Sequence, residues 1–172
     1  MKVKKGFTLI ELIAAIAILG IVFAGVSIGL IAGVRTEKKS DAKLETSTFA
    51  KALVENIKVQ DESTLKNINT VNYIFFDDKA TLEDGMIKLF IRNSSTASTK
   101  TDIAILPSKN LSYCSYSSCK AVNQNSSHNN RKYGACILIN STTANRYEVQ
   151  VWMWDFKFGE GSLAKREFYI RR

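Results

Sequence analysis

The chain has 172 residues, of which 45% are hydrophobic and 23% are charged, and its formal net charge at pH 7 is +8. Its aliphatic content is ample for a hydrophobic core and excludes an intrinsically disordered chain. The length suits one modest domain together with a membrane anchor.

A long apolar run begins close to the N-terminus. Residues 7–34 number 28, and only Thr8, Glu11 and Ser27 break their apolar or small character. As an α-helix this run would be about 42 Å long, whereas the hydrocarbon core of a bilayer is about 30 Å thick. The run can therefore span a membrane. Glu11 is the anomaly within it, because a charged side chain at the centre of a membrane helix costs about 2.5–3.5 kcal/mol on insertion scales.

The residues around the start of the run form a specific motif. Three lysines precede Gly6, which is followed by the letters FTLIEL. This segment resembles the leader and first residues of type IV pilins and the related pseudopilins. The resemblance implies that prepilin peptidase, a membrane aspartic peptidase, cuts between Gly6 and Phe7 and methylates the new amino terminus. It also implies that Glu11 meets the positively charged Phe7 terminus of a neighbouring subunit during assembly.

Two simpler interpretations fit this segment less well. In an ordinary secretory signal the cleavage site lies beyond a shorter apolar core, whereas here Gly6 precedes the run and cleavage would leave the helix on the mature protein. A plain membrane anchor has no use for Gly6 or Glu11. An opposite charge on a neighbouring subunit, in contrast, would offset the cost of burying the carboxylate.

The charge distribution alone leaves the orientation of the anchor open, since basic residues flank the apolar run on both sides. They are Lys2, Lys4 and Lys5 before the run and Arg35, Lys38, Lys39 and Lys43 after it. The resemblance implies an extracytoplasmic C-terminal part. The chain would then be a single-pass protein of the cytoplasmic membrane, in contact with an inner-membrane assembly platform and other pilin subunits, and later part of a cell-surface filament.

Three glycines recur every four residues within the run, at Gly25, Gly29 and Gly33. Small residues at this spacing let membrane helices approach closely, which makes the three glycines candidates for helix packing. The simpler explanation is that glycine is common in transmembrane helices.

The helical pattern continues beyond the membrane run. Residues 35–60 contain no Gly or Pro, and apolar residues recur among charged ones at helical spacing. We therefore predict one long helix, with a transmembrane part over residues 7–34 and an amphipathic part over residues 35–60. Asp61 then marks the exit of the helix or caps a short following turn.

Residues 61–172 have the shorter period of β-strands and form a predicted globular head. We predict strands at residues 71–76, 86–91, 103–106, 135–139, 147–158 and 166–170, the last at a sheet edge, with residues 141–146 as a hairpin loop. The apolar positions of 147–158 indicate burial on both faces or a bulge. The predicted fold is α+β, with the long N-terminal helix packed on a small antiparallel β-sheet head.

A polar insert rich in Ser and Asn separates the predicted strands at residues 109–132. It contains Cys114 and Cys119, and Cys136 follows in the next strand. We expect one disulfide, in any of the three pairings, to stabilise a loop with little core of its own, and three reduced thiols are the alternative. A metal site is not expected, because three cysteines and one histidine lack paired ligand spacing.

The chain carries few signs of catalysis. It has no Ser-His-Asp order, no Gly-rich phosphate loop and no metal triad, so we expect neither enzymatic activity nor a cofactor. An acidic cluster fits no recognised calcium loop and is explained by turn chemistry. Its members are Asp77, Asp78, Glu83 and Asp84.

Basic residues make DNA a candidate ligand. The candidate contacts are Arg131 and Lys132 beside the insert and Arg171 and Arg172 at the C-terminal end, and tyrosines lie near the first pair. Positive charge combined with stacking rings is typical of non-specific nucleic-acid grooves. A solvated basic face is the commoner explanation.

The sequence therefore predicts a non-catalytic structural subunit, most consistent with a minor pilin of a type IV pilus. The alternative is a pseudopilin of a type II secretion or competence DNA-uptake machine. The predicted segments are a leader (1–6), the transmembrane helix (7–34), its amphipathic continuation (35–60) and the head (61–172).

Overall fold

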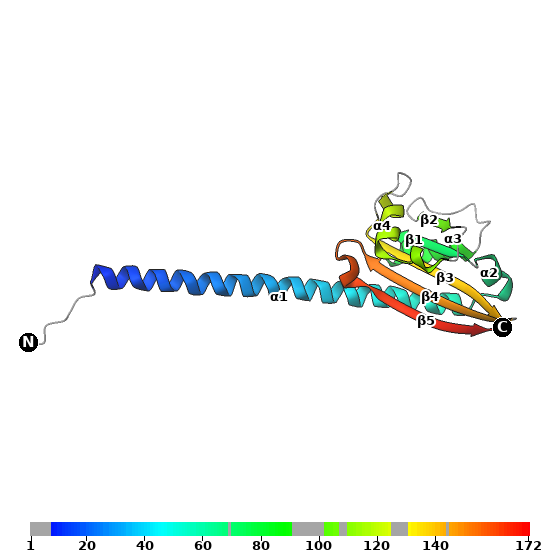
Figure 1. Ribbon diagram of the computed structural model, residues 1–172, viewed down its shortest axis with the longest axis horizontal. Coiled ribbons are helices and arrows are strands. Elements are labelled where there is room, and N and C mark those ends of the chain that lie inside the picture. The colour runs from blue at the N-terminus through cyan, green and yellow to red at the C-terminus, as the bar shows by residue number, and fades with distance from the viewer. Residues whose placement is uncertain (1–7, 69, 91–101, 107–109, 125–130, 144) are drawn as a thin grey trace, which may run out of the picture. The chain divides into compact units, whose positions relative to one another are not determined.

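The protein is described here by a computed structural model, which defines residues 8–68, 70–90, 102–106, 110–124, 131–143 and 145–172. The chain divides into two compact units, Met1–Lys38 and Lys39–Arg172. The first helix, α1, runs without interruption over Leu9–Lys58, which confirms the prediction of one long helix (Figure 1). The elements that follow are α2 (Glu62–Asn67), β1 (Val71–Phe76), α3 (Lys79–Phe90), β2 (Asp102–Leu106), η1 (Leu111–Tyr113), α4 (Tyr116–Gln124), β3 (Tyr133–Thr143), β4 (Arg146–Asp155), η2 (Gly159–Ser162) and β5 (Ala164–Arg171).

Asp61 caps the short helix that follows α1, which is one of the two roles predicted for it. Asp61 is the N-cap of α2, and its Oδ1 accepts a hydrogen bond from the backbone N–H of Thr64 at 2.9 Å. Hydrogen bonds from Thr64 lower the pKa of the Asp61 carboxyl. An ionised cap of this kind is favoured at a helix N-terminus, so it accounts for the start of α2 shortly after the end of α1.

The five strands of the head form one sheet in the order β2-β1-β3-β4-β5, and every neighbouring pair is antiparallel. The structure thus confirms the α+β prediction. β1, β2 and β5 lie where the sequence predicts strands, and β5 is an edge strand as expected.

One predicted strand is wrong. Residues 86–90 belong to α3, and residue 91 lies outside the described residues. The dipeptide Asp84-Gly85 is typical of a turn, but it lies inside a helix whose buried Leu82, Met86 and Leu89 recur at helical spacing. Asp78 starts this helix, since its Oδ1 accepts from the N–H of Thr81 at 2.8 Å.

Two boundaries are also wrong. The predicted loop at residues 141–146 is much shorter, because β3 extends to Thr143 and β4 begins at Arg146, with a register shift between Ser141 and Thr143. Asn145, which has a positive φ of 65°, supports this tight connection, since Asn tolerates the left-handed region better than most residues. At its other end β4 stops at Asp155 rather than at residue 158.

The first hydrophobic core lies between the sheet and α1, α2 and α3. The second half of α1 contributes Phe49, Ala50, Leu53, Val54 and Ile57, and the odd-numbered residues of β4 from Tyr147 to Met153 meet them from the sheet. In Figure 1 this part of α1 runs along β3, β4 and β5. Burial of one face of an otherwise charged helix follows from its amphipathic pattern.

A second core covers the opposite face of the sheet. Trp152 and Trp154 of β4 point to this side, together with Tyr73 of β1 and the three cysteines. β4 is therefore buried on both faces over its second half, which is one of the two interpretations that its sequence allows. The cover comes from η1 and α4, which form in the insert and which the sequence analysis missed.

Candidate functional site

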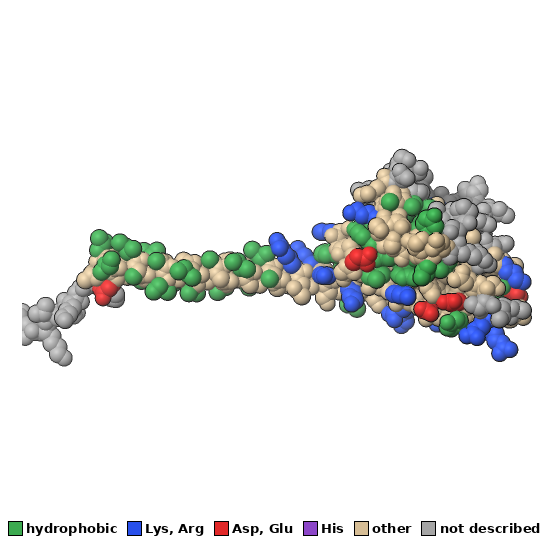
Figure 2. All heavy atoms as spheres, viewed as in Figure 1, with side chains coloured by type: hydrophobic (Ala, Val, Ile, Leu, Met, Phe, Trp, Pro, Cys, Tyr) green, Lys and Arg blue, Asp and Glu red, His purple; other side chains and the backbone are tan. Residues whose placement is uncertain are grey.

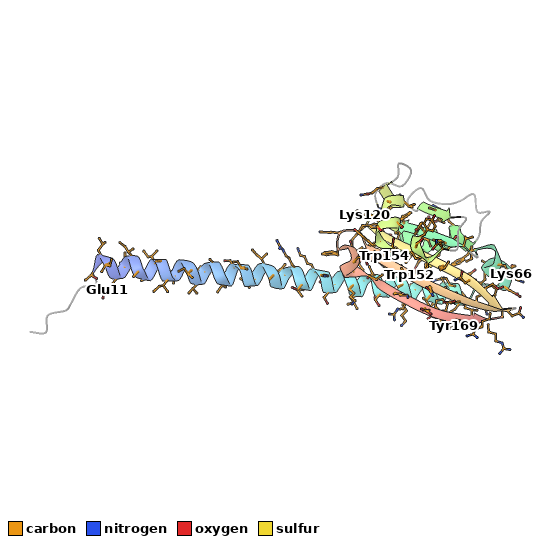
Figure 3. The ribbon with its side chains drawn as sticks, viewed as in Figure 1. Glu11, Lys66, Lys120, Trp152, Trp154 and Tyr169 are labelled. Atoms are coloured by element: carbon orange, nitrogen blue, oxygen red, sulfur yellow. The ribbon has the colours of Figure 1, made fainter. Side chains whose placement is uncertain are left out.

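The start of α1 is organised by a reciprocal pair of hydrogen bonds between Thr8 and Glu11 (Figure 3 labels Glu11). The Oε2 of Glu11 accepts from the backbone N–H of Thr8 at 2.9 Å and from its hydroxyl at 2.9 Å. The N–H of Glu11 in turn donates to the hydroxyl oxygen of Thr8 at 3.4 Å. This arrangement is a capping box, in which an N-cap Thr and a Glu three residues later satisfy backbone donors that a helix start leaves open.

The capping box gives Glu11 a local role that the sequence analysis did not recognise, although the Thr-x-x-Glu signal is present in FTLIE. It fixes the carboxylate at the first turn of the apolar helix. The other two residues of the predicted processing and assembly site, Gly6 and Phe7, lie outside the described residues.

The first part of α1 is apolar on all sides. Its most apolar window has a mean hydropathy of 2.7, none of that window is buried inside the protein, and α1 is long and apolar enough to cross a membrane. Figure 2 shows hydrophobic side chains covering this stretch. Exposure of so many large aliphatic side chains in water is strongly unfavourable, so this stretch requires lipid or protein around it.

The three predicted packing glycines lie in this stretch. Apart from the backbone of α1 itself and the adjacent residues, no described atom lies within 4 Å of the position that a Cβ would take at Gly25, Gly29 or Gly33. A spacing of four residues advances only about 40° around a helix, so the three share one side of α1. That side is free for close approach of another helix, and its use for packing stays a prediction.

The structure contains no disulfide, so the predicted cross-link is wrong. Cys114, Cys119 and Cys136 are all described, and all three are buried free thiols. The thiol of Cys136 contacts that of Cys114, with the two sulfur atoms 2.8 Å apart. The prediction assumed that the insert has little core of its own, whereas η1 and α4 pack these cysteines against the tryptophans of β4.

We expect Cys119 to resist alkylation in the folded protein. Burial raises the pKa of its thiol, and only the thiolate reacts rapidly. α4 also holds it against β3, where a Cβ at Gly134 would lie 2.8 Å from its sulfur. Iodoacetamide labelling followed by peptide mass analysis, before and after unfolding, measures this. Rapid modification of Cys119 under native conditions would show that α4 does not stay closed over the sheet.

The acidic cluster is used for structure. Asp77 accepts from the backbone N–H of Lys132 at 2.9 Å and pairs with Arg131, while Asp78 caps α3. Glu83 and Asp84 form ion pairs within α3 with lysines one turn away. Among the described residues, no group of three or more metal-ligating side chains comes together.

The four basic candidates for DNA contact do not form one patch. Arg131 and Lys132 precede β3, whose first residue pairs with Asp155 at one end of β4, whereas Arg171 pairs with Arg146 at the other end. The nine residue steps between those ends correspond to about 30 Å. The candidates therefore make two separate groups on the head.

Several of these groups also have partners within the protein. The guanidinium of Arg131 is 2.8 Å from Asp77 with only 10% of its side chain exposed, and that of Arg172 donates to the backbone oxygen of Gln60 at 2.7 Å. The ring of Tyr133 is buried, so it offers no stacking platform for a base. Arg131 and Arg172 are therefore engaged in contacts within the head rather than in one solvated basic face.

Comparison with known proteins adds one finding. Residues 1–27 match the family model for the prokaryotic N-terminal methylation motif. The chain therefore carries a leader of the type found in type IV pilins and pseudopilins, followed by an apolar N-terminal helix. No curated protein and no solved structure matches the chain.

Proposed function

We propose that this protein is a non-catalytic structural subunit of a type IV pilus or related filament, inserted in the membrane and assembled through α1. The observation that carries the proposal is that three features occur together at the start of α1. Within the residues that match the methylation motif, the capping box fixes a carboxylate in the first turn of an exposed apolar helix. An anchor alone requires only the last of these features.

Because the apolar stretch of α1 is exposed, it needs an apolar environment both before and after assembly. Before assembly the hydrocarbon core of the cytoplasmic membrane covers it, with the head outside. After assembly the same stretch packs against α1 helices of other pilin subunits, and the side that carries Gly25, Gly29 and Gly33 allows close approach. Prepilin peptidase and an inner-membrane assembly platform are the partners that this route requires.

Within this class we favour a minor pilin. The head carries a separate insert, with α4 packed over the bulky aromatic residues of β4, and this elaboration fits a specialised subunit. DNA is not part of the proposal, because the four candidate cations fall into two groups at opposite ends of the sheet.

The test of the proposal is N-terminal processing. We expect the mature protein to begin at Phe7 and to carry an N-methyl group, because the resemblance to prepilin leaders implies cleavage directly after Gly6. Intact-mass and N-terminal peptide analysis of protein from the membranes of its native host measures both. A Gly6→Leu variant is the control and should keep its leader. Wild-type protein that retains residues 1–6 in the same host would contradict the proposal.

A further inference from the structure

Within the head unit, α1 carries opposite charges on two opposite sides. Lys39 and Lys43 are four residues apart and share one side, and Asp41 and Glu45 share another. An offset of two residues turns about 200° around a helix, so the two pairs face away from each other. All four residues are exposed, and Glu45 approaches the ammonium of Lys132 at 3.8 Å within the same chain. We call Asp41 and Glu45 the acidic row.

Strand β5 enlarges the basic side into a concave site. The guanidinium of Arg166 donates to the hydroxyl of Ser47 at 2.9 Å, and Ser47 lies one turn after Lys43 on the same side of α1. The two elements enclose an open hollow of about 210 Å³. It is lined by Lys43, Ser47, Leu163, Ala164, Lys165 and Arg166, and we call it the basic hollow.

The charge of the basic hollow is little compensated from within the chain. None of its lining residues is acidic. Glu167 approaches the ammonium of Lys165 only at 3.8 Å, and half of the Lys165 side chain remains exposed. The side chain of Lys39 lies nearby over Gly161 of η2, where a Cβ would overlap it. A site with three cations and a partly apolar floor fits a carboxylate or phosphate ligand.

We propose that the basic hollow receives the acidic row of a second copy of this chain. The carboxylates of Asp41 and Glu45 complement the three cations of the hollow, and every copy carries both surfaces. The exposed Leu44 lies beside that row, and the partly buried Leu163 of the hollow provides an apolar contact for it. A pocket on one side and its complement on the other make a heterologous contact, which builds an open filament when the rotation between copies does not close.

This inference rests on the proposed filament role. It adds that the subunit in contact with the basic hollow is a second copy of this chain. It requires that copies be consecutive in at least part of the filament. The test uses the full-length protein in its native host and measures the protein recovered in the filament fraction relative to the membrane fraction. Three charge-reversed variants are compared: Lys43→Glu with Arg166→Glu, Asp41→Lys with Glu45→Lys, and all four together.

We expect each double reversal to lower recovery in filaments at least about tenfold, because like charges at an interface strongly disfavour association. The fourfold variant should recover most of the loss, since every contact again joins opposite charges. Lys51→Glu with Arg171→Glu makes the same change of charge at exposed positions elsewhere on the head, and should behave as wild type. Protease resistance of the head shows that each variant is folded.

Zero-length carbodiimide cross-linking gives a second readout. Lys43 and Asp41 lie on opposite sides of α1, so an amide between them cannot form within one copy, and its detection in wild-type filaments supports the contact. Absence of rescue by the fourfold variant, or cross-links from Lys43 only to a different protein, would overturn the inference. Wild-type protein absent from filaments would instead contradict the proposed function, so the two failures are distinguishable.

Discussion

Replacing Glu11 with alanine is expected to leave the protein in the membrane and to prevent its incorporation into filaments. Insertion should be unchanged or improved, because the change removes a charged group from an apolar helix. Assembly should fail because the positively charged terminus of a neighbouring subunit loses its partner. Removing one member of a buried charge pair costs about 2–5 kcal/mol, which corresponds to at least about a thirtyfold loss of association.

The capping box makes a sharper comparison possible. A Glu11→Gln variant removes the charge and keeps a side chain that can accept from the N–H of Thr8, since glutamine also serves in capping boxes. If the charge is what assembly needs, the Glu11→Gln variant should fail as the alanine variant does. A Thr8→Val variant removes the capping hydroxyl and keeps the carboxylate, so it should weaken the first turn and retain assembly in large part.

The measurement is the ratio of protein in sheared filaments to protein in membranes, with membrane insertion checked by alkaline extraction. Normal incorporation of the Glu11→Ala variant would show that the carboxylate has no role in assembly. Normal incorporation of Glu11→Gln together with failure of Glu11→Ala would assign the role of Glu11 to the capping box alone.

The sequence predicts correctly those parts of the fold where its hydrophobic pattern and its turn residues indicate the same element. α1 has no breaker between residue 34 and its end, and its apolar residues keep one helical period, so its length and its buried side follow directly. β1 is a short apolar run between turn residues, and β5 ends the sheet with charged residues that suit an edge.

The errors arise where two signals conflict. Gly85 resembles a strand boundary, yet tertiary packing of Leu82, Met86 and Leu89 on the sheet outweighs the cost of a glycine inside a helix. The insert, judged by composition alone, is too polar to supply a core. α4 buries only Cys119 and Asn123, and the large apolar surface that it covers belongs to the sheet rather than to the helix itself.

At the N-terminal site the chemical motif is readable from the sequence and the local geometry is less so. Gly6, Phe7 and Glu11 stand out by residue type and spacing. The hydrogen bonds between Thr8 and Glu11 were missed because the carboxylate was interpreted only as a partner for another subunit. The contact that Arg166 makes was not readable either, since only the fold brings β5 beside Ser47 of α1.

Packing of α1 on the sheet is expected to hold the head together, and Leu53→Ala is the variant that tests it. Leu53 has no exposed surface, and it lies in the core shared by α1, α3 and the sheet. Truncating a fully buried leucine removes its transfer free energy and leaves a cavity, at a cost of about 2–5 kcal/mol. For a head of this size the thermal midpoint should fall by at least about 6 °C.

Leu44→Ala is the matched control, because it makes the same chemical change on the same helix at a residue that is 70% exposed. Its effect on the free energy of unfolding should stay within about 0.5 kcal/mol. Thermal unfolding of the detergent-solubilised full-length protein, followed by near-ultraviolet circular dichroism, reports on the packing of Trp152 and Trp154 in the head. Equal midpoints for the two variants would mean that α1 does not pack on the sheet, and that the head folds around its sheet without the helix.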